Sequence, residues 1–443
     1  MDPDELVDLN SGFIHNDVFS EPFYRRELDA IFGRCWIMVG HESSVPNPQD
    51  YMLSCIGEDS VIIQRDRKGH VRVYLNKCRH RGAELCLYDR GNSASFTCSY
   101  HGWTFTDGAL TGVPAKKDAY QSGLDAESLS LIEVPRVSLY GGLIFACWDR
   151  DAIALEEYLG EARFYLDNFL LRVEMGGLEV VPAPQKYMMP VNWKLLAENF
   201  AGDMYHFGQT HSSVIQLLQR GKGARIDFRG TKAKMASVLA RGADGAPHGF
   251  LELSVGSEGL EADLRQAKEL GPECEAWVLA RQKLLEEKLK STQTKPYSFH
   301  VGNIFPNFAL IGVGTAGYGK GLILHHPRGP NATEVWVWAA VEKSAPAAMK
   351  ARQRFVLMQR QAVAGIVAPD DHEVFRRIRD NITNHMASKQ PFHYAMGIAD
   401  DADEATADNG AYAGLPGRIL PQYSEATQRA FYRYWSEQLK RVK

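Results

Sequence analysis

The sequence has no excess of positive charge, no long apolar run and no basic leader. Its 443 residues carry 50 Lys and Arg against 54 Asp and Glu, a net charge of −4, which gives no electrostatic support for nucleic-acid binding. No uninterrupted apolar stretch approaches the roughly 20 residues needed to span a bilayer. The N-terminus, Met1 to Glu5, is acidic and lacks the basic and then apolar order of a signal peptide. We therefore expect a cytoplasmic protein that binds neither membrane nor nucleic acid.

Cysteine is also scarce, with seven residues spread along the chain at positions 35, 55, 78, 86, 98, 147 and 274. An odd number of widely spaced cysteines argues against a disulfide framework and for reduced thiols, some of them bound to metal. The chain is nevertheless long, and 443 residues exceed the usual size of one core. Two domains are therefore expected, and we found no internal repeat.

The pattern of apolar residues changes near residue 37. Residues 13–36 have mostly helical spacing, and short β-type runs separated by turn residues then continue to residue 148. We interpret residues 37–150 as a small all-β domain. Residues 151–443, together with the N-terminal segment 1–36, are expected to form a larger domain of mixed α and β structure. Within it, residues 212–300 are less regular, and we interpret them as surface loops, or a cover over a substrate entrance, before a helix at 275–290.

Two short clusters in the all-β domain each pair a thiol with an imidazole. Cys78 and His80 form a Cys-x-His pair, and Cys98 and His101 form a Cys-x2-His pair. Zinc sites more often use Cys-x2-Cys pairs, whereas two cysteines on one iron and two histidines on the other suit a [2Fe–2S] cluster. Glycines and a tryptophan flank the pairs, as expected for tight loops with an apolar cover. The pattern predicts a [2Fe–2S] site, and a zinc-binding protein is the alternative.

A second group of polar residues lies in the larger domain, behind a helix for which Asn192 is a suitable N-cap. The group consists of Asn199, Asp203, His206 and His211. On a continued helix the first three share one face. His211 can join that face only if the helix breaks, and Gly208 is a residue type that permits a break. Two imidazoles and a carboxylate brought together in this way indicate a mononuclear metal site, although two ordinary histidines beside a helix end would give the same spacing.

The identity of the third ligand is open on these grounds. Two histidines and one carboxylate on one face of iron leave other positions free for dioxygen. Asp203 is the nearest carboxylate in sequence, and the pair Asp370-Asp371 offers two more. His372 is a competing donor.

Together these motifs resemble the α subunit of the Rieske non-haem iron aromatic-ring-hydroxylating dioxygenases, with the closest likeness to the naphthalene-dioxygenase branch. The likeness rests on Cys-x-His…Cys-x2-His-Gly-Trp at 78–103, Asn-Trp-Lys at 192–194, Glu-Asn-Phe at 198–200 and Asp-x2-His-x4-His at 203–211. It extends from about residue 15 to a C-terminal helix at residues 424–439. It implies an α+β fold in which an all-β Rieske domain is inserted in a larger, helix-grip-like catalytic domain.

The resemblance also implies which residues hold the metals. The [2Fe–2S] ligands would be Cys78, His80, Cys98 and His101, and the mononuclear Fe(II) ligands would be His206, His211 and Asp371. Asn199 and Asp203 would belong to the catalytic site. Asp203 would hydrogen-bond His206 and also His101 of the partner subunit, linking the two metal centres.

The activity implied is that of a terminal oxygenase component. Electrons from NAD(P)H would arrive through a reductase and a ferredoxin, and both atoms of O2 would be added to an aromatic ring to give a cis-dihydrodiol. Three α subunits would assemble with three small β subunits. The alternatives are monooxygenation, action on an aromatic carboxylic acid, or a protein of another class, namely an electron carrier or a zinc-binding protein.

The substrate pocket implied by the family comprises Phe200, Phe207, Phe299, Val301, His325, Gln361 and Val367. Close relatives have histidine and asparagine where this chain has Phe299 and Val301, and tryptophan where it has Val367. Few charges occupy these positions, which favours a neutral hydrocarbon with several or fused rings. Arg360, beside Gln361, is the reason that an aromatic acid remains the alternative.

Overall fold

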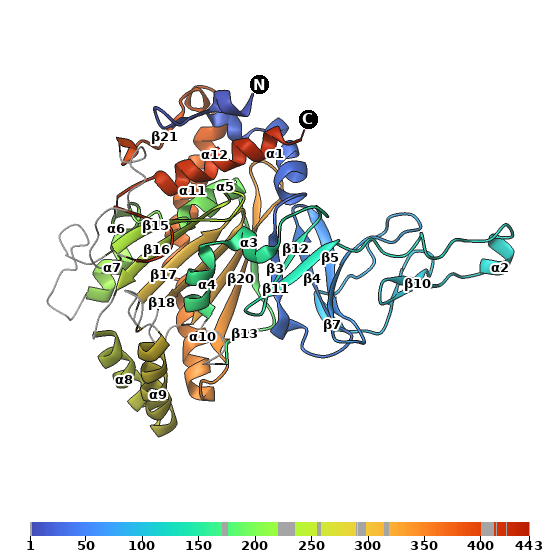
Figure 1. The fold of residues 1–443 in the computed structure, drawn as a ribbon, viewed down its shortest axis with the longest axis horizontal. Coiled ribbons are helices and arrows are strands. Elements are labelled where there is room, and N and C mark those ends of the chain that lie inside the picture. The colour runs from blue at the N-terminus through green and yellow to red at the C-terminus, as the bar shows by residue number, and fades with distance from the viewer. Residues whose placement is uncertain are drawn as a thin grey trace. The chain divides into compact units, whose positions relative to one another are not determined.

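The computed structural model describes residues 2–170, 176–219, 235–254, 258–288, 290, 298–313, 319–399, 412, 414–421 and 423–442. The chain forms two compact units, Phe32–Ala152 and the combination of Met1–Ile31 with Ile153–Lys443 (Figure 1). The smaller unit is therefore inserted in the sequence of the larger one. It is built almost wholly of β-strands, whereas the larger unit combines a long sheet with helices. The expected fold class, an all-β domain inserted in an α+β domain, is confirmed.

Three antiparallel sheets make up the smaller unit. The four-stranded sheet has the order β6-β5-β4-β7 and consists of β4 (Asp50–Ile56), β5 (Asp59–Arg65), β6 (Val71–Leu75) and β7 (Arg90–Asn92). The two three-stranded sheets consist of β3 (Ile37–His41), β11 (Arg136–Tyr140) and β12 (Leu143–Cys147), and of β8 (Phe96–Thr97), β9 (Thr104–Thr106) and β10 (Ala109–Gly112). A short helix, α2 (Lys116–Ala119), follows β10. Two of the connections between these strands contain the thiol and imidazole pairs: Cys78 and His80 lie between β6 and β7, and Cys98 and His101 lie between β8 and β9.

The larger unit is organised around a nine-stranded antiparallel sheet. Its main path has the order β13-β20-β19-β18-β17-β16-β15-β22, and β14 pairs with β20 beside β13. The strands are β13 (Leu178–Val180), β14 (Gln185–Met189), β15 (Met235–Arg241), β16 (Pro247–Ser254), β17 (Ser298–Ile304), β18 (Phe308–Val313), β19 (Lys320–Pro327), β20 (Thr333–Glu342) and β22 (Arg418–Leu420). A separate small sheet of β1 (Val7–Asp8), β2 (Phe13–Ile14) and β21 (Phe392–His393) joins the N-terminal segment to the chain near residue 392.

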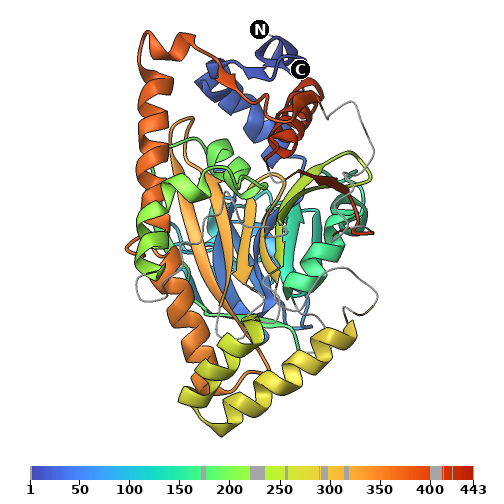
Figure 2. The same ribbon diagram turned by 90° about the vertical axis from the view of Figure 1, so that its left-hand side faces the viewer.

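Helices pack around this sheet. They are α1 (Glu21–Glu27), α3 (Leu155–Leu159), α4 (Ala162–Leu170), α5 (Trp193–Phe200), α6 (Phe207–Thr210), α7 (Ser212–Gln219), α8 (Glu258–Leu270), α9 (Pro272–Lys288), α10 (Ala347–Gln361), α11 (Ala368–Thr383) and α12 (Ala426–Lys440). Figure 2 shows α8 and α9 beside the end of α10, and buried Ala267, Val278 and Met349 join the three helices in one apolar cluster. No helix in the described ranges is both long and apolar enough to cross a membrane.

A fully buried ion pair fixes helix α5, which leads into the expected iron site. Glu27 of α1 and Lys194 of α5 are both inaccessible to solvent and form an ion pair. The indole nitrogens of Trp193 and Trp435 each donate to the same carboxylate, at 2.8 Å. Breaking a buried pair costs about 3–5 kcal/mol because it leaves an uncompensated charge. Glu27 therefore ties α1, α5 and α12 together.

One expectation about local structure is confirmed and another is wrong in part. Residues 13–36 are mostly helical, as expected, with a 3-10 turn at Asn16–Phe19, the helix α1 and a π-helical turn at Leu28–Phe32 after the short strand β2. Where it is described, the stretch 212–300 is regular, because α7, β15, β16 and α8 lie within it before α9. Residues 236–240 of β15 are all buried. A strand buried on both faces shows no in–out alternation, which is why the sequence pattern missed it.

Candidate metal centres and substrate cavity

The two loops with thiol and imidazole pairs are closed by the same backbone hydrogen bonds. The Cys78 N–H donates to the carbonyl of Ala83 at 2.8 Å, and the N–H of Gly82 donates back to Cys78 at 3.0 Å. In the second loop Cys98 and Trp103 form the equivalent bond at 2.8 Å, and a glycine again donates back to the cysteine, at 2.9 Å. Both glycines have positive φ, at 81° and 73°, a conformation that other residues rarely adopt. The two loops are therefore built alike although their histidines differ in spacing.

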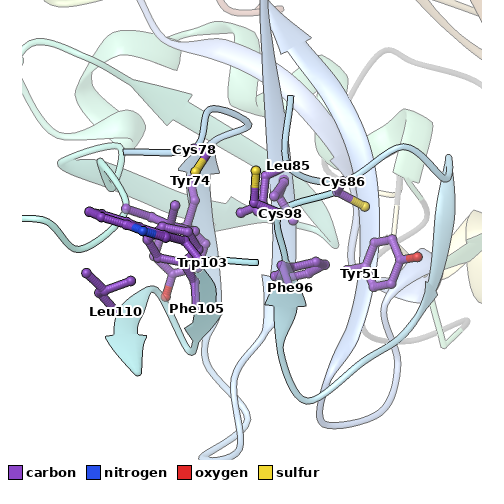
Figure 3. Close-up of a cluster of buried hydrophobic side chains, with 12 residues drawn as sticks. Tyr51, Tyr74, Cys78, Leu85, Cys86, Phe96, Cys98, Trp103, Phe105 and Leu110 are labelled. Atoms are coloured by element: carbon purple, nitrogen blue, oxygen red, sulfur yellow. The ribbon is translucent and has the colours of Figure 1, made fainter. Parts of the chain in front are cut away.

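The four side chains of these loops are brought together. Figure 3 shows Cys78 and Cys98 close together in the buried apolar cluster of the smaller unit, between Trp103 and Cys86, and their exposed fractions are only 2% and 3%. The ring centroids of His80 and His101 are 4.6 Å apart. The indole ring of Trp103 stacks on His80 at 4.7 Å. Thiols are thus buried in the core, while the imidazoles are partly accessible at the edge of the unit.

These residues fit a [2Fe–2S] cluster by two observations. The Nδ1 atom of His80 is buried and has no hydrogen-bond partner in the described part of the chain, as expected for a nitrogen that ligates a metal. Burial raises the pKa of Cys78, and the neighbouring Cys98 sulfur raises it further. Two buried thiols held side by side need a bound metal to be stable as thiolates.

Helix α5 ends before the iron motif begins. Asn192 caps its start, because the side-chain oxygen accepts the Lys194 N–H at 3.0 Å. The helix ends at Phe200, and Gly202 follows with a φ of 107°. The backbone of Ala201 packs directly on β16, where a side chain at Gly249 would lie 2.3 Å from the Ala201 carbonyl oxygen. The expectation of one helix continuing to Gly208 is therefore wrong.

The helix ends earlier than expected, but His206 and His211 still lie close together. Because the chain turns after α5, a new short helix, α6, contains Gly208 and separates His206 from His211. The two imidazole centroids are 5.5 Å apart. Sequence spacing thus predicted the proximity of these two histidines, although the expected local structure was incorrect.

The third residue of this cluster comes from α11. Among the described residues, His206, His211 and Asp371 each offer one ligand atom, and these atoms lie within 4.8 Å of one another. Asp371 Oδ1 lies 3.3 Å from His211 Nε2 and 3.7 Å from His206 Nε2. Asp371 is in the first turn of its helix, where the helix dipole favours a negative charge. Three donors converging with their Nε2 and Oδ1 atoms on one point suit a mononuclear iron with open positions.

The other two candidate carboxylates take different places. Asp203 Oδ2 lies 3.1 Å from His206 Nδ1, and Asp370 Oδ2 lies 3.3 Å from His211 Nδ1. Each imidazole therefore has one carboxylate behind it and faces Asp371 with its other nitrogen. Carboxylates in this position fix the tautomer and orientation of a ligating histidine.

Electrostatics support the Asp203–His206 pair. Burial would lower the pKa of His206, but the hydrogen bond and charge of Asp203, with the charge of Asp371, raise it above its usual range. Burial would raise the pKa of Asp203, but contact with His206 lowers it. The Asn199 amide lies 3.4 Å from the same Nδ1 atom of His206. His372, the competing donor, instead places its Nε2 atom 3.2 Å from the Tyr187 hydroxyl.

An apolar cavity of about 150 Å³ adjoins the three converging residues. Its described lining includes His206, His211, Asp371 and mostly apolar neighbours: Phe200, Met204, Phe207, Val214, Ile215, Leu251, Val301, Ile311 and Val367. The other polar residues of the described lining are Asn199, Asp203, Arg360 and Gln361. Burial lowers the pKa of Arg360 to about 10, so the guanidinium remains charged at neutral pH.

Comparison with known proteins assigns both units. Residues 35–133 match the Rieske [2Fe-2S] domain, and residues 155–441 match the catalytic domain of the ring hydroxylating alpha subunit. The biphenyl 2,3-dioxygenase subunit alpha of Rhodococcus jostii strain RHA1 is 37% identical over 439 residues, which cover 97% of this chain and 90% of the relative. This chain belongs to the ring-hydroxylating dioxygenase α subunits.

Other members of the family give the same result. The large oxygenase component of the naphthalene 1,2-dioxygenase system of Pseudomonas aeruginosa is 32% identical, over 95% of this α subunit and 89% of the relative. A naphthalene 1,2-dioxygenase structure with indole in its active site superposes with a TM-score of 0.84 at 30% identity, covering 99% of this chain and 95% of that one. The family expected from the motifs is therefore confirmed. The α subunit is an oxygenase that uses O2 as a reactant and has a Rieske [2Fe–2S] cluster and mononuclear iron as its cofactors.

The expected pocket residues of the α subunit are placed as follows. Phe200, Phe207, Val301, Gln361 and Val367 line the cavity. His325 is only 1% exposed and lies outside the described lining, with its ring centroid 5.7 Å from that of Phe200. The side chain of Phe299 lies outside the described residues.

Sequence reasoning missed several residues of the α subunit's site. Met204, Val214, Ile215, Leu251 and Ile311 line the cavity, but each is an ordinary apolar residue in its own segment. Only the fold selects them, because they come from the turn after α5, from α7 and from two strands of the sheet. The pairing of Asp370 with His211 was also missed, since 159 residues separate them in the chain.

Proposed function

We propose that this α subunit is the terminal oxygenase component that adds both atoms of O2 to an aromatic hydrocarbon, giving a cis-dihydrodiol. The observation that carries the proposal is the convergence of His206, His211 and Asp371 on one wall of a mostly apolar cavity. Bound iron at that wall would supply the activation of O2. The chain's own task is to hold an uncharged ring against it in a water-poor space.

We assign the metal-binding residues on the same basis. Cys78, His80, Cys98 and His101 would hold the [2Fe–2S] cluster, and His206, His211 and Asp371 would hold the mononuclear iron. Asn199 and Asp203 act behind His206. Asp203 keeps the imidazole oriented and accepts its Nδ1–H, so that Nε2 remains available as a ligand.

The electron path is proposed to run through partners. Relatives are named as subunits or components of larger dioxygenase systems. A reductase and a ferredoxin would pass electrons from NAD(P)H to the Rieske cluster. Asp203 would then connect His206 to His101 of the partner subunit, in an assembly of three α and three β subunits. Such a system would work in the cytoplasm, where NAD(P)H and reduced thiols are maintained.

The described lining favours a neutral substrate. Its apolar side chains match the arenes named for the relatives, namely biphenyl, benzene and naphthalene. Valine at 301 and at 367 leaves width for a fused or second ring. One observation favours an aromatic carboxylic acid as the alternative, because Arg360 and Gln361 both lie in the cavity wall.

Turnover with purified reductase and ferredoxin tests the proposal. Biphenyl and naphthalene would be compared with the matched carboxylates, 4-biphenylcarboxylate and 2-naphthoate, and products would be identified by mass and by stereochemistry. Cis-dihydrodiols from the hydrocarbons are expected. Preferred conversion of the acids would replace the neutral substrate with the alternative, and formation of phenols alone would replace dioxygenation with monooxygenation.

A further inference from the structure

A second cavity borders the iron-binding residues, and a buried acid lies in its wall. Glu198 is near the end of α5, is only 8% exposed, and lies four residues after Lys194. Its Oε1 accepts the hydroxyl of Tyr394 at 2.7 Å. Its Oε2 is buried and makes no hydrogen bond of ordinary geometry among the described residues, although the Tyr432 hydroxyl lies close enough to favour the ionised form. Burying an ionised carboxylate with one oxygen that lacks a hydrogen bond costs more free energy than burying the neutral carboxylic acid.

The charges around Glu198 also favour the neutral acid. Asp203 and Glu425 lie on the same cavity and oppose its ionisation, and burial is the largest cause, so that the pKa of Glu198 is raised to about 8. The ammonium of Lys194 is paired with Glu27, and its weaker attraction for Glu198 does not offset burial. The pKa values of Tyr394 and Tyr432 are raised well above their usual range by burial, so both phenols stay neutral. Glu198 therefore carries a proton at neutral pH.

The cavity connects this proton to the iron site. It has a volume of about 190 Å³, enough for several waters, and its described lining includes Glu198, Asp203, His206 and Asp371. The substrate cavity shares the last three of these residues but not Glu198. The acid thus borders a cavity that reaches the proposed iron ligands, and it is not part of the described lining of the substrate cavity.

We propose that Glu198 is the residue that holds a proton for the oxygen chemistry and releases it through this cavity. The inference rests on the proposed function, because adding O2 to an arene as a cis-dihydrodiol consumes two electrons and two protons. The electrons come from the redox partners. The Oε2–H bond of Glu198 breaks, its electron pair stays on the carboxylate, and the proton passes through cavity water toward the reduced oxygen. Solvent then returns a proton to Oε2, and the second proton is released in the same way. Glu198 does not touch the reacting atoms, and it acts through water.

The main test is Glu198→Gln, which keeps the size of the side chain and an oxygen for Tyr394 but has no proton to release. Pre-reduced enzyme would be mixed with naphthalene and O2, and Rieske oxidation and product would be followed from pH 6 to 9.5. Wild type should slow as pH rises through the titration of Glu198, since the proton is lost there. The variant should be about tenfold slower or more at pH 7 and should lack that step, because general acids contribute about 10²–10⁴-fold. Iron content and the Rieske spectrum should be unchanged.

The matched control is Glu425→Gln, the same change at another acid of this cavity. Glu425 accepts the Met396 N–H at 2.8 Å and is not expected to supply the proton, so the wild-type pH profile should persist. If Glu425→Gln removed the alkaline step and Glu198→Gln kept it, the assignment to Glu198 would be wrong. An equal rate and an equal pH profile for Glu198→Gln and wild type would also overturn it.

Two further measurements keep the test decisive if Glu198→Gln folds poorly or if the chosen arene is not a substrate. Infrared difference spectra of iron-free wild type should show a protonated-carboxyl band that titrates above neutral pH, and absence of that band would contradict the proposal without any turnover. Tyr394→Phe removes a hydrogen bond that stabilises the ionised form, so the pKa of Glu198 should rise and the band should titrate at higher pH. If the infrared band titrates as expected but no arene is converted to product, the result would instead count against the proposed function.

Discussion

The two metal sites of this α subunit are encoded in different ways. In the smaller unit, two loops closed by the same pair of backbone hydrogen bonds supply all four candidate ligands within residues 78–101. In the larger unit, His211 meets residues of α11 that lie about 160 positions later, since 159 residues separate it from Asp370. The first site is a property of a short segment, whereas the second exists only when the sheet and its helices have assembled. The two sites should therefore respond differently to mutation.

We expect the largest difference between the two metal sites in the variant Cys98→Ala. Loss of one thiolate should abolish the [2Fe–2S] cluster completely, because the remaining sulfur cannot hold its iron alone. The mononuclear site should keep most of its iron, since its ligands belong to another compact unit. Metal analysis and the visible spectrum of the purified protein would check both statements. Loss of both metals from a folded protein would show that the two sites depend on each other.

The reverse experiment uses the larger unit. His211→Ala or Asp371→Ala removes one of the three converging donors, so product formation should fall below detection while the reducible Rieske centre remains. His206→Ala should act in the same way. Product yield per reduced cluster is the measurement. Turnover near the wild-type rate in any of these variants would mean that the iron ligands have been assigned incorrectly.

The same contrast explains what the sequence could predict. The Cys-x-His and Cys-x2-His pairs lie in one segment, so residue type and spacing were enough to indicate a cluster. His206 and His211 were also found by spacing, although the helix was expected to break at Gly208 and instead ends at Phe200. Part of the reason is local, because Gly202 follows the C-cap Ala201 with a φ of 107°, and a glycine in this position is typical of a helix end. The close approach of Ala201 to Gly249 of a distant strand could not be seen in the local sequence.

Long-range partners could not be predicted from local pattern at all. Asp371 was chosen over Asp203 and Asp370 only through family resemblance, because all three carboxylates are chemically suitable. The fold distinguishes them by geometry: Asp371 faces both Nε2 atoms, and the other two lie behind the imidazoles at Nδ1. The cavity residues Leu251 and Ile311 were equally unpredictable, because they line the cavity only when their strands are paired in the sheet.

Asp203→Asn tests a smaller effect, the link between the two sites. The amide keeps the size of the side chain but loses the charge that orients His206. Changes behind a metal ligand cost about 10–100-fold in affinity or activity, and a residue in the electron path could cost more. We expect a normal Rieske spectrum, much of the iron, and far slower Rieske oxidation when pre-reduced enzyme meets substrate and O2. A wild-type oxidation rate with normal product yield would exclude the bridging role.

Asp370→Asn provides the matched comparison and the smallest expected effect. Asp370 lies 3.3 Å from His211 Nδ1, and Asp203 lies 3.1 Å from His206 Nδ1. Each amide variant should therefore weaken the support of one histidine that we propose as an iron ligand. If support is the whole role of Asp203, the two variants should lose iron affinity and Rieske oxidation rate in equal measure. If Asp203 also carries electrons between subunits, Asp370→Asn should lower iron affinity by about tenfold and leave the oxidation rate per iron-loaded site near that of wild type. Iron titration combined with rapid-mixing absorbance separates the two quantities. Equal slowing in both variants, after correction for iron content, would reduce Asp203 to a residue that only orients its histidine.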